Sequence, residues 1–215
     1  MEKFEHVKDT LLQFFLYAHV TCGMTALLTG FVSIVTEKGR KVHRTSGKIF
    51  FVAMILVAVS AFIIAVAKSN SFLLAISIFS FYLNFFSYRA LKNKHAKHKW
   101  FDWLVIVLST ATCVYMIATM QIVLVVFGCL LAYVLMGNVL PQWQGEEKLK
   151  EVRRKRMLAH IGNMMGAYIA TVTAFAVVNI NFVKPGWLVW LTPTAIGLPI
   201  VSYYTRVWKK KLKLD

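Results

Sequence analysis

The chain of 215 residues is 58% apolar and only 16% charged, whereas soluble domains carry about 25% charged residues. Its net charge of +16 would suit a nucleic-acid partner. However, the 25 Lys and Arg residues lie between apolar runs and do not gather on one solvent-exposed face. Composition therefore indicates a polytopic membrane protein and excludes a nucleic-acid partner.

Seven apolar runs approach or reach the ~20 residues that a helix needs to cross a ~30 Å hydrocarbon core. They span residues 11–35, 48–67, 72–91, 101–118, 122–140, 157–180 and 187–207. Residues 101–140 are almost continuously apolar, and such a stretch would form a rod of ~60 Å, which is two crossings. We therefore expect a turn near Ala118–Gln121 and one all-α domain over residues 1–215, a bundle of seven transmembrane helices.

Basic residues alternate between the two sides of this bundle. Of the 25 Lys and Arg residues, 21 lie in the first, third and fifth connections and in the C-terminal tail. The other four are Lys3, Lys8, Lys68 and Lys184. Because cytoplasmic loops carry an excess of Lys and Arg, we expect the N-terminus outside and the C-terminus in the cytoplasm.

The sixth run combines a histidine with a stripe of small residues. On a period near 3.6, Gly162 and Gly166 lie one above the other, which predicts a close approach by another helix within lipid. His160 and Asn163 lie on the neighbouring stripe. An ionisable ring beside such a seam has to face protein or a cavity, because lipid would leave its nitrogens unpaired.

The first run carries His19, with Gly23 and Gly30 on the same helical face. These small residues predict that another helix lies close to the imidazole. Two interpretations stay open. The ring forms a hydrogen bond to a hydroxyl or carbonyl across the seam, or it takes part in ligand, cofactor or proton chemistry.

The first connection holds His43 and Arg44 at the expected membrane surface, with Gly47 three residues on. Its charges are expected to fix the topology and to meet anionic lipids. A clamp for a small anion or a headgroup is the alternative. The third connection contains His95 and His98 among lysines, which is typical of a solvated basic loop.

The fifth connection, EEKLKEVRRKR, predicts an amphipathic extension whose basic end lies on acidic lipid. In the seventh run, Pro193 and Pro199 remove two backbone donors within two turns. This predicts a kink or a break there, either satisfied by threonine hydroxyls or lining a substrate site.

All nine carboxylates lie in loops or at the ends of the apolar runs. The sequence therefore lacks the buried carboxylate on which many carriers, retinal proteins and intramembrane hydrolases depend. Histidine is the one ionisable residue type expected inside the membrane, and neutral imidazole is a common metal ligand.

Three motifs together resemble a known family. They are AHxxxG at His19, KG…HRxxGxxFF around His43 and Arg44, and HxxxMxxxYIATxTAFxVxN from His160 to Asn179. The chain resembles a bacterial family of predicted membrane proteins that is known only as a domain of unknown function. The resemblance implies a multi-pass membrane fold and importance for His19, His43, Arg44 and His160, but no established activity. We expect the protein to lie in a bacterial cytoplasmic membrane.

The leading hypothesis is a histidine-lined site for a small ligand, a metal or a haem-like cofactor, in a redox role. The candidate ligand residues are His19, His43, Arg44, His160 and Asn163, and His43 and His160 are the candidates for metal. Depth along the helices separates His19 from His160 by ~13 Å, so we expect them not to share one ion.

Two other classes of function stay open: a carrier or channel for a small solute, and a non-catalytic lipid-binding or assembly subunit. The expected partners are the bilayer and its anionic lipids at the cytoplasmic face. The sequence leaves a homo-oligomer open and does not decide whether the protein is an enzyme.

The topology can be tested directly. A reporter enzyme fused after Gln121 should score as external, because the basic residues alternate only if residues 101–140 cross twice. A cytoplasmic signal from that fusion would contradict the seven-helix topology.

Overall fold

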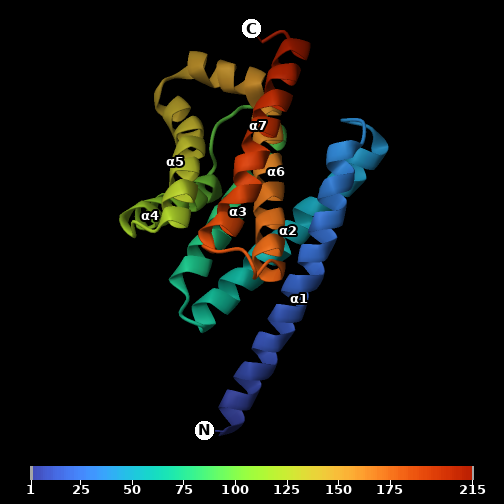
Figure 1. Cartoon of the computed structure of the whole chain (residues 1–215). Helices are drawn as coiled ribbons and strands as arrows, with labels where there is room; N and C mark the ends of the chain where they lie inside the picture. The colour runs from blue at the N-terminus through green and yellow to red at the C-terminus, as the bar shows by residue number, and fades with distance from the viewer. Residues whose placement is uncertain (1, 215) are drawn as a thin grey trace. The chain divides into compact units, whose positions relative to one another are not determined.

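The computed structural model describes the backbone of residues 2–214 and the side chains of residues 9–214. Figure 1 shows the elements, which are all helical in this part of the chain. They are α1 Glu2–Val35, α2 Lys41–Ala67, α3 Ser71–Lys92, α4 Trp100–Ala118, α5 Ile122–Trp143, α6 Glu146–Asn179 and α7 Trp187–Lys211. The all-α prediction is confirmed.

Six helices, α1 to α6, are long and apolar enough to cross a membrane. Among the described residues α7 does not meet that standard, since Pro193, Pro199 and the pair Tyr203–Tyr204 interrupt its apolar sequence. The structure therefore supports a membrane protein with several apolar helices. The seventh crossing and the orientation of the termini stay predictions.

Helices α1, α2 and α6 begin well before the apolar runs that predicted them, and α1 begins at Glu2. Helix α2 begins at Lys41, which places His43 and Arg44 in its first turns and shortens the preceding connection to residues 36–40. Helix α6 begins at Glu146 and includes the charged segment EEKLKEVRRKR. Its first turns run at an angle to its remainder (Figure 1), as expected of an extension that lies along a surface.

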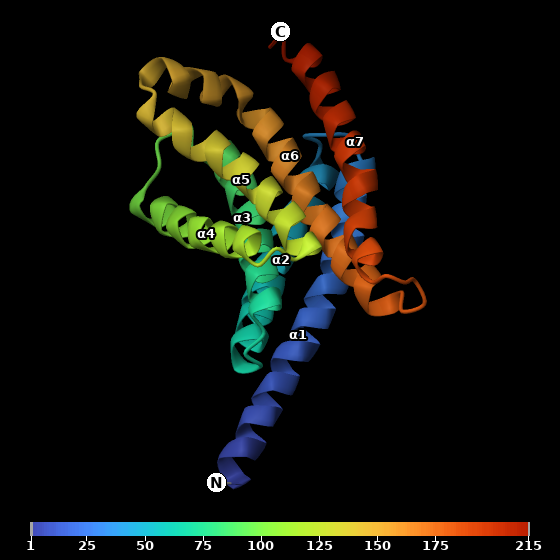
Figure 2. The same cartoon turned by 60° about the vertical axis from the view of Figure 1, so that its left-hand side comes forward.

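The apolar stretch of residues 101–140 forms two helices, with the turn at the predicted position. Helix α4 ends at Ala118, Met120 has a φ of +55°, and α5 begins at Ile122. The two helices pack side by side (Figure 2). The prediction of two helices in this stretch is confirmed.

The chain separates into two compact units, Met1–Phe81 and Tyr82–Asp215, and α3 contributes to both. In the first unit α1 packs on α2, with Ala26 and Phe50 buried. In the second unit α6 packs on α7 and α4 on α5. The expectation of a single domain stays a prediction.

Helix α7 continues through both of its prolines, so it is not broken there. It lies close to α6 at Gly197, where an added Cβ would be 2.4 Å from Ile169 Cδ1 and 2.6 Å from its Cγ1. At Gly166 the added Cβ would be 3.3 Å from Leu83 Cδ1, and at Gly162 nothing lies within 4 Å. Of these three glycines, Gly197 is therefore the one where an added methyl group would clash most severely with a neighbouring helix.

We expect Gly197→Ala to lower the melting temperature in detergent, because the β-branched Ile169 has few alternative rotamers in a helix. Gly162→Ala is the matched control. It should raise stability by up to about 1 kcal/mol, since alanine is the better helix former and meets no neighbour.

The double variant Gly197→Ala with Ile169→Ala should recover part of the loss by removing the clash. If Gly197→Ala is as stable as Gly162→Ala, the close α6–α7 contact does not exist in solution.

Candidate histidine sites

His19 on α1 is held by α2. Its Nδ1 lies 3.1 Å from the carbonyl oxygen of Val57 and 3.1 Å from Ser60 Oγ. The Ser60 hydroxyl lies 2.7 Å from the carbonyl of Leu56 and donates to it. Because a carbonyl only accepts, Nδ1 carries the proton and donates to Val57 and Ser60.

His160 on α6 is held in a similar way by α3. Its Nδ1 lies 3.0 Å from Ser87 Oγ and 3.2 Å from the carbonyl oxygen of Ser87. The Ser87 hydroxyl also reaches the carbonyl of His160 at 3.2 Å, and Ser87 is 0% exposed. Asn163, the other candidate on this face, is buried less than one turn further along α6.

His43 lies where α1 and α2 meet. Its Nδ1 donates to the carbonyl of Ser33 at 2.9 Å, and Ser33 Oγ pairs with Ser46 Oγ at 2.7 Å. Lys38 Nζ reaches the same Ser33 carbonyl at 3.0 Å and so caps the C-terminal end of α1. The Arg44 side chain is exposed at this end of α2.

The three histidines share one arrangement, in which Nδ1 faces a backbone carbonyl. A neutral ring with its proton on Nδ1 keeps its lone pair on Nε2. Histidines that bind metals are usually oriented by such a bond from the second ring nitrogen. Nε2 is therefore the nitrogen through which such a neutral ring would bind a ligand.

The described residues offer single imidazoles and no closed metal cage, because no three His, Cys, Asp or Glu side chains among them gather around one point. His19 and His43 belong to the first compact unit and His160 to the second. A metal shared by His43 and His160 therefore stays a prediction. The packing roles proposed for Gly23, Gly30, Gly162 and Gly166 are likewise untested, although Gly30 is buried in α1.

A buried ion pair that the sequence did not indicate links the end of α3 to the start of α4. Arg89 Nε donates to Asp102 Oδ1 at 2.7 Å, and Arg89 Nη2 donates to Oδ2. The backbone N–H of Lys99 donates to Oδ2 at 2.8 Å. Asp102 is 2% exposed, so three charge-assisted bonds compensate for the loss of its hydration.

His98 lies beside this ion pair, in the connection between α3 and α4. Its side chain is 8% exposed, and its Nε2 donates to the carbonyl of Asn138 at 3.0 Å. Its Nδ1 lies 4.0 Å from Asp102 Oδ2. The expected solvated loop is therefore wrong for His98, while His95 is exposed as expected.

Burial lowers the pKa of His98, although the Asn138 carbonyl and Asp102 act in the opposite direction, and Arg89 adds to the lowering. The unfolded chain, with an ordinary histidine pKa of about 6.5, thus binds a proton that the folded chain binds less readily. The stability that His98 contributes is complete above about pH 6.5 and is lost as the pH falls below it.

We therefore predict that the melting temperature falls on acidification from pH 7.5 to 5.5, and that His98→Gln reduces this fall. His95→Gln, in the same connection but exposed, should leave the fall unchanged. An equal pH dependence in wild type and His98→Gln would show that His98 does not titrate in this way.

No curated protein and no solved structure matched this chain. One family did match, over residues 16–142, and it is described as "Predicted membrane protein (DUF2306)". The matched stretch includes His19, His43 and Arg44 and ends before His160. Since it covers more than half of the chain, the protein belongs to this family of predicted membrane proteins of unknown function.

Proposed function

We propose that this membrane protein binds a small ligand, a metal or a haem-like cofactor through the Nε2 atoms of its histidines, for use in redox chemistry. The observation that supports this most is the shared orientation of His19, His43 and His160, each with Nδ1 against a carbonyl. A histidine that serves only to join helices could use either nitrogen.

His19 and His160 are the principal proposed ligands. Serine hydroxyls at 3.1 Å and 3.0 Å fix the two rings in addition to the carbonyls, so each imidazole is held before any ligand arrives. A preoriented ligand loses less conformational freedom on binding. We propose two separate sites, in keeping with the expected difference in depth.

His43 and Arg44 form a third proposed binding site, which is more polar than the other two. The ring is fixed on Ser33, and the exposed guanidinium beside it suits a small anion or the charged edge of a cofactor. Lys38 adds a second cation at the same end of α1.

We place the protein in a bacterial cytoplasmic membrane, with the N-terminus outside and anionic lipids against its basic connections. The basic asymmetry of the sequence supports this orientation. A solute carrier is less favoured, because that hypothesis relied on a broken seventh helix and α7 is continuous. A homo-oligomer remains compatible with the proposal.

The test uses the full chain purified in detergent, first by metal analysis and absorption spectroscopy and then by titration with haemin and with Zn²⁺. We expect His19→Ala and His160→Ala each to remove part of the binding and the double variant to remove nearly all of it. His95→Ala, at an exposed position, is the control.

Binding that is the same in wild type and in the double variant would contradict the proposal. So would a wild-type protein that carries no cofactor and takes up neither probe. Loss of all binding in each single variant would instead mean that the two rings share one ligand.

A further inference from the structure

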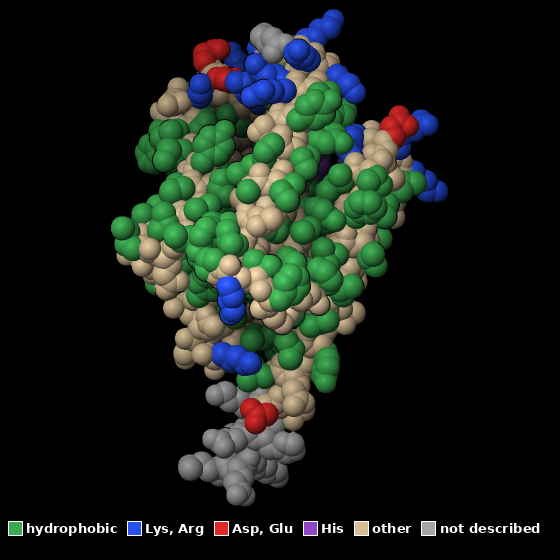
Figure 3. Space-filling view, viewed as in Figure 1, with side chains coloured by type: hydrophobic (Ala, Val, Ile, Leu, Met, Phe, Trp, Pro, Cys, Tyr) green, Lys and Arg blue, Asp and Glu red, His purple; other side chains and the backbone are tan. Residues whose placement is uncertain are grey.

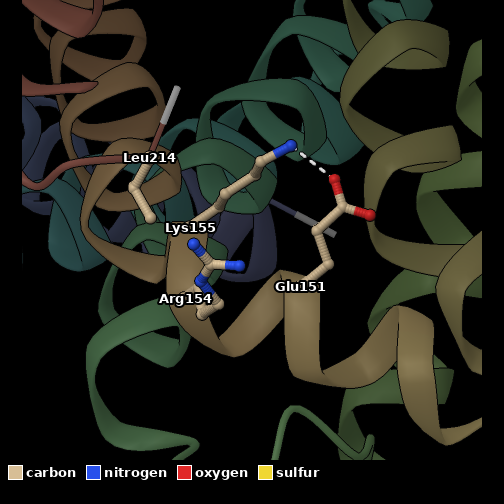
Figure 4. A pocket seen from close by; sticks show the side chains of 4 residues that line it. All are labelled: Glu151, Arg154, Lys155 and Leu214. Atoms are coloured by element: carbon tan, nitrogen blue, oxygen red, sulfur yellow. Dashed lines mark hydrogen bonds and ion pairs between the residues drawn. The ribbon is translucent and has the colours of Figure 1, made fainter. Parts of the chain in front are cut away.

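The second compact unit contains a small surface cavity of about 210 Å³ where the extension of α6 meets the end of the chain. It is lined by Glu151, Arg154 and Lys155 of α6 and by Leu214, which follows α7 (Figure 4). Figure 4 shows one ion pair among these residues, between Lys155 and Glu151. The lining thus combines two cations, a neutralised carboxylate and an apolar side chain.

Among the described residues, the ion pairs along the extension leave two cations without a carboxylate, Arg154 and Arg156, and of these only Arg154 lines the cavity. Each acidic residue of the segment already has a basic partner: Glu146 pairs with Arg153 at 2.9 Å, Glu147 with Lys150 at 2.5 Å, and Glu151 with Lys148 at 2.7 Å and with Lys155. For Arg154 the described residues provide no ion pair. Its guanidinium is exposed and lines the cavity.

The end of α7 supplies the opposite wall. Lys213 has a φ of +51°, and the Leu214 N–H returns to the carbonyl of Lys209 at 3.2 Å. This turn brings an apolar side chain against the cavity. Lys209, Lys210 and Lys211 occupy the preceding helical turn. Figure 3 shows Lys and Arg side chains gathered at this end of the second unit.

We propose that this cavity binds the phosphate headgroup of an anionic glycerophospholipid, with Arg154 as its main cationic contact. The inference rests on the membrane placement given under the proposed function. A guanidinium donates two parallel hydrogen bonds to a phosphate, which a lysine cannot do. Leu214 provides the apolar contact that a lipid's glycerol and first methylenes need, and that a free phosphate does not.

The helices next to the cavity in the chain carry exposed aromatic rings. Trp143, at the end of α5 just before α6, is 76% exposed, and Tyr203, on α7, is 65% exposed. Exposed Trp and Tyr rings near basic helix ends are typical of the interface between membrane and water. The first turns of α6 would thus lie along the surface, with the cavity open to the headgroups.

The experiment titrates the full chain in neutral detergent with a short-chain phosphatidylglycerol and, separately, with phosphatidylcholine, and follows the melting temperature. We expect a stabilising shift with phosphatidylglycerol only. Arg154→Gln should weaken the apparent affinity by about tenfold, the effect of losing one charge-assisted contact.

Lys150→Gln is the matched control, because it removes the same charge from the same helical segment while its side chain, paired with Glu147, does not line the cavity. It should change the affinity by less than about twofold. Glu151→Gln should strengthen binding, since it removes the carboxylate from the cavity and releases Lys148 and Lys155.

Equal losses in Arg154→Gln and Lys150→Gln would overturn the proposal in favour of diffuse attraction. Full competition by inorganic phosphate at the lipid concentration would mean a site for free anions, which also overturns it. The metal and haem content of the same samples reports on the histidine sites independently, so the two proposals can fail separately.

Discussion

The structure depends on one constraint: a polar group inside a lipid-facing helix bundle has to find its hydrogen-bond partner within the protein. His19 meets it with Val57 and Ser60, and His160 meets it with Ser87. In both cases the acceptor includes a backbone carbonyl, which cannot donate. The constraint therefore determines more than position: it requires a proton on Nδ1, so that in a neutral ring the lone pair lies on Nε2, which is the atom that a ligand would use.

The same constraint explains the charge distribution in the second unit. Asp102, the one almost fully buried carboxylate among the residues of this unit that the structure describes, accepts two bonds from Arg89 and one from the Lys99 N–H. The other carboxylates of this unit's described residues lie on the first turns of α6, where they pair with neighbouring lysines and Arg153. Buried charges are thus matched at short range, while unmatched cations such as Arg154 remain at the surface, where lipid headgroups are available.

Local features of the sequence predicted the helices well. Apolar length alone placed the turn between α4 and α5, and charge pattern indicated the helical extension of α6. Contacts between residues that are distant in the sequence could not be predicted from it. The lysines around His98 predict a solvated ring, yet the ring is buried and bonds to the carbonyl of Asn138, forty residues away. Gly197 lies in no small-residue stripe, and only the approach of Ile169 reveals its role. For His19, the hydrogen bond across a helix seam was one of the two interpretations that the sequence left open, and its partners required the structure.

The proposed sites depend on His19 and His160 being neutral rings with the proton on Nδ1. Solid-state ¹⁵N NMR of histidine-labelled protein in lipid vesicles reports directly which ring nitrogen is protonated, and single His→Ala variants assign the signals. We expect a protonated Nδ1 and an unprotonated Nε2 for both rings near neutral pH. A proton on Nε2 at either residue would contradict this expectation, because a neutral ring protonated there could not donate to its carbonyl and a doubly protonated ring could not offer Nε2 to a ligand.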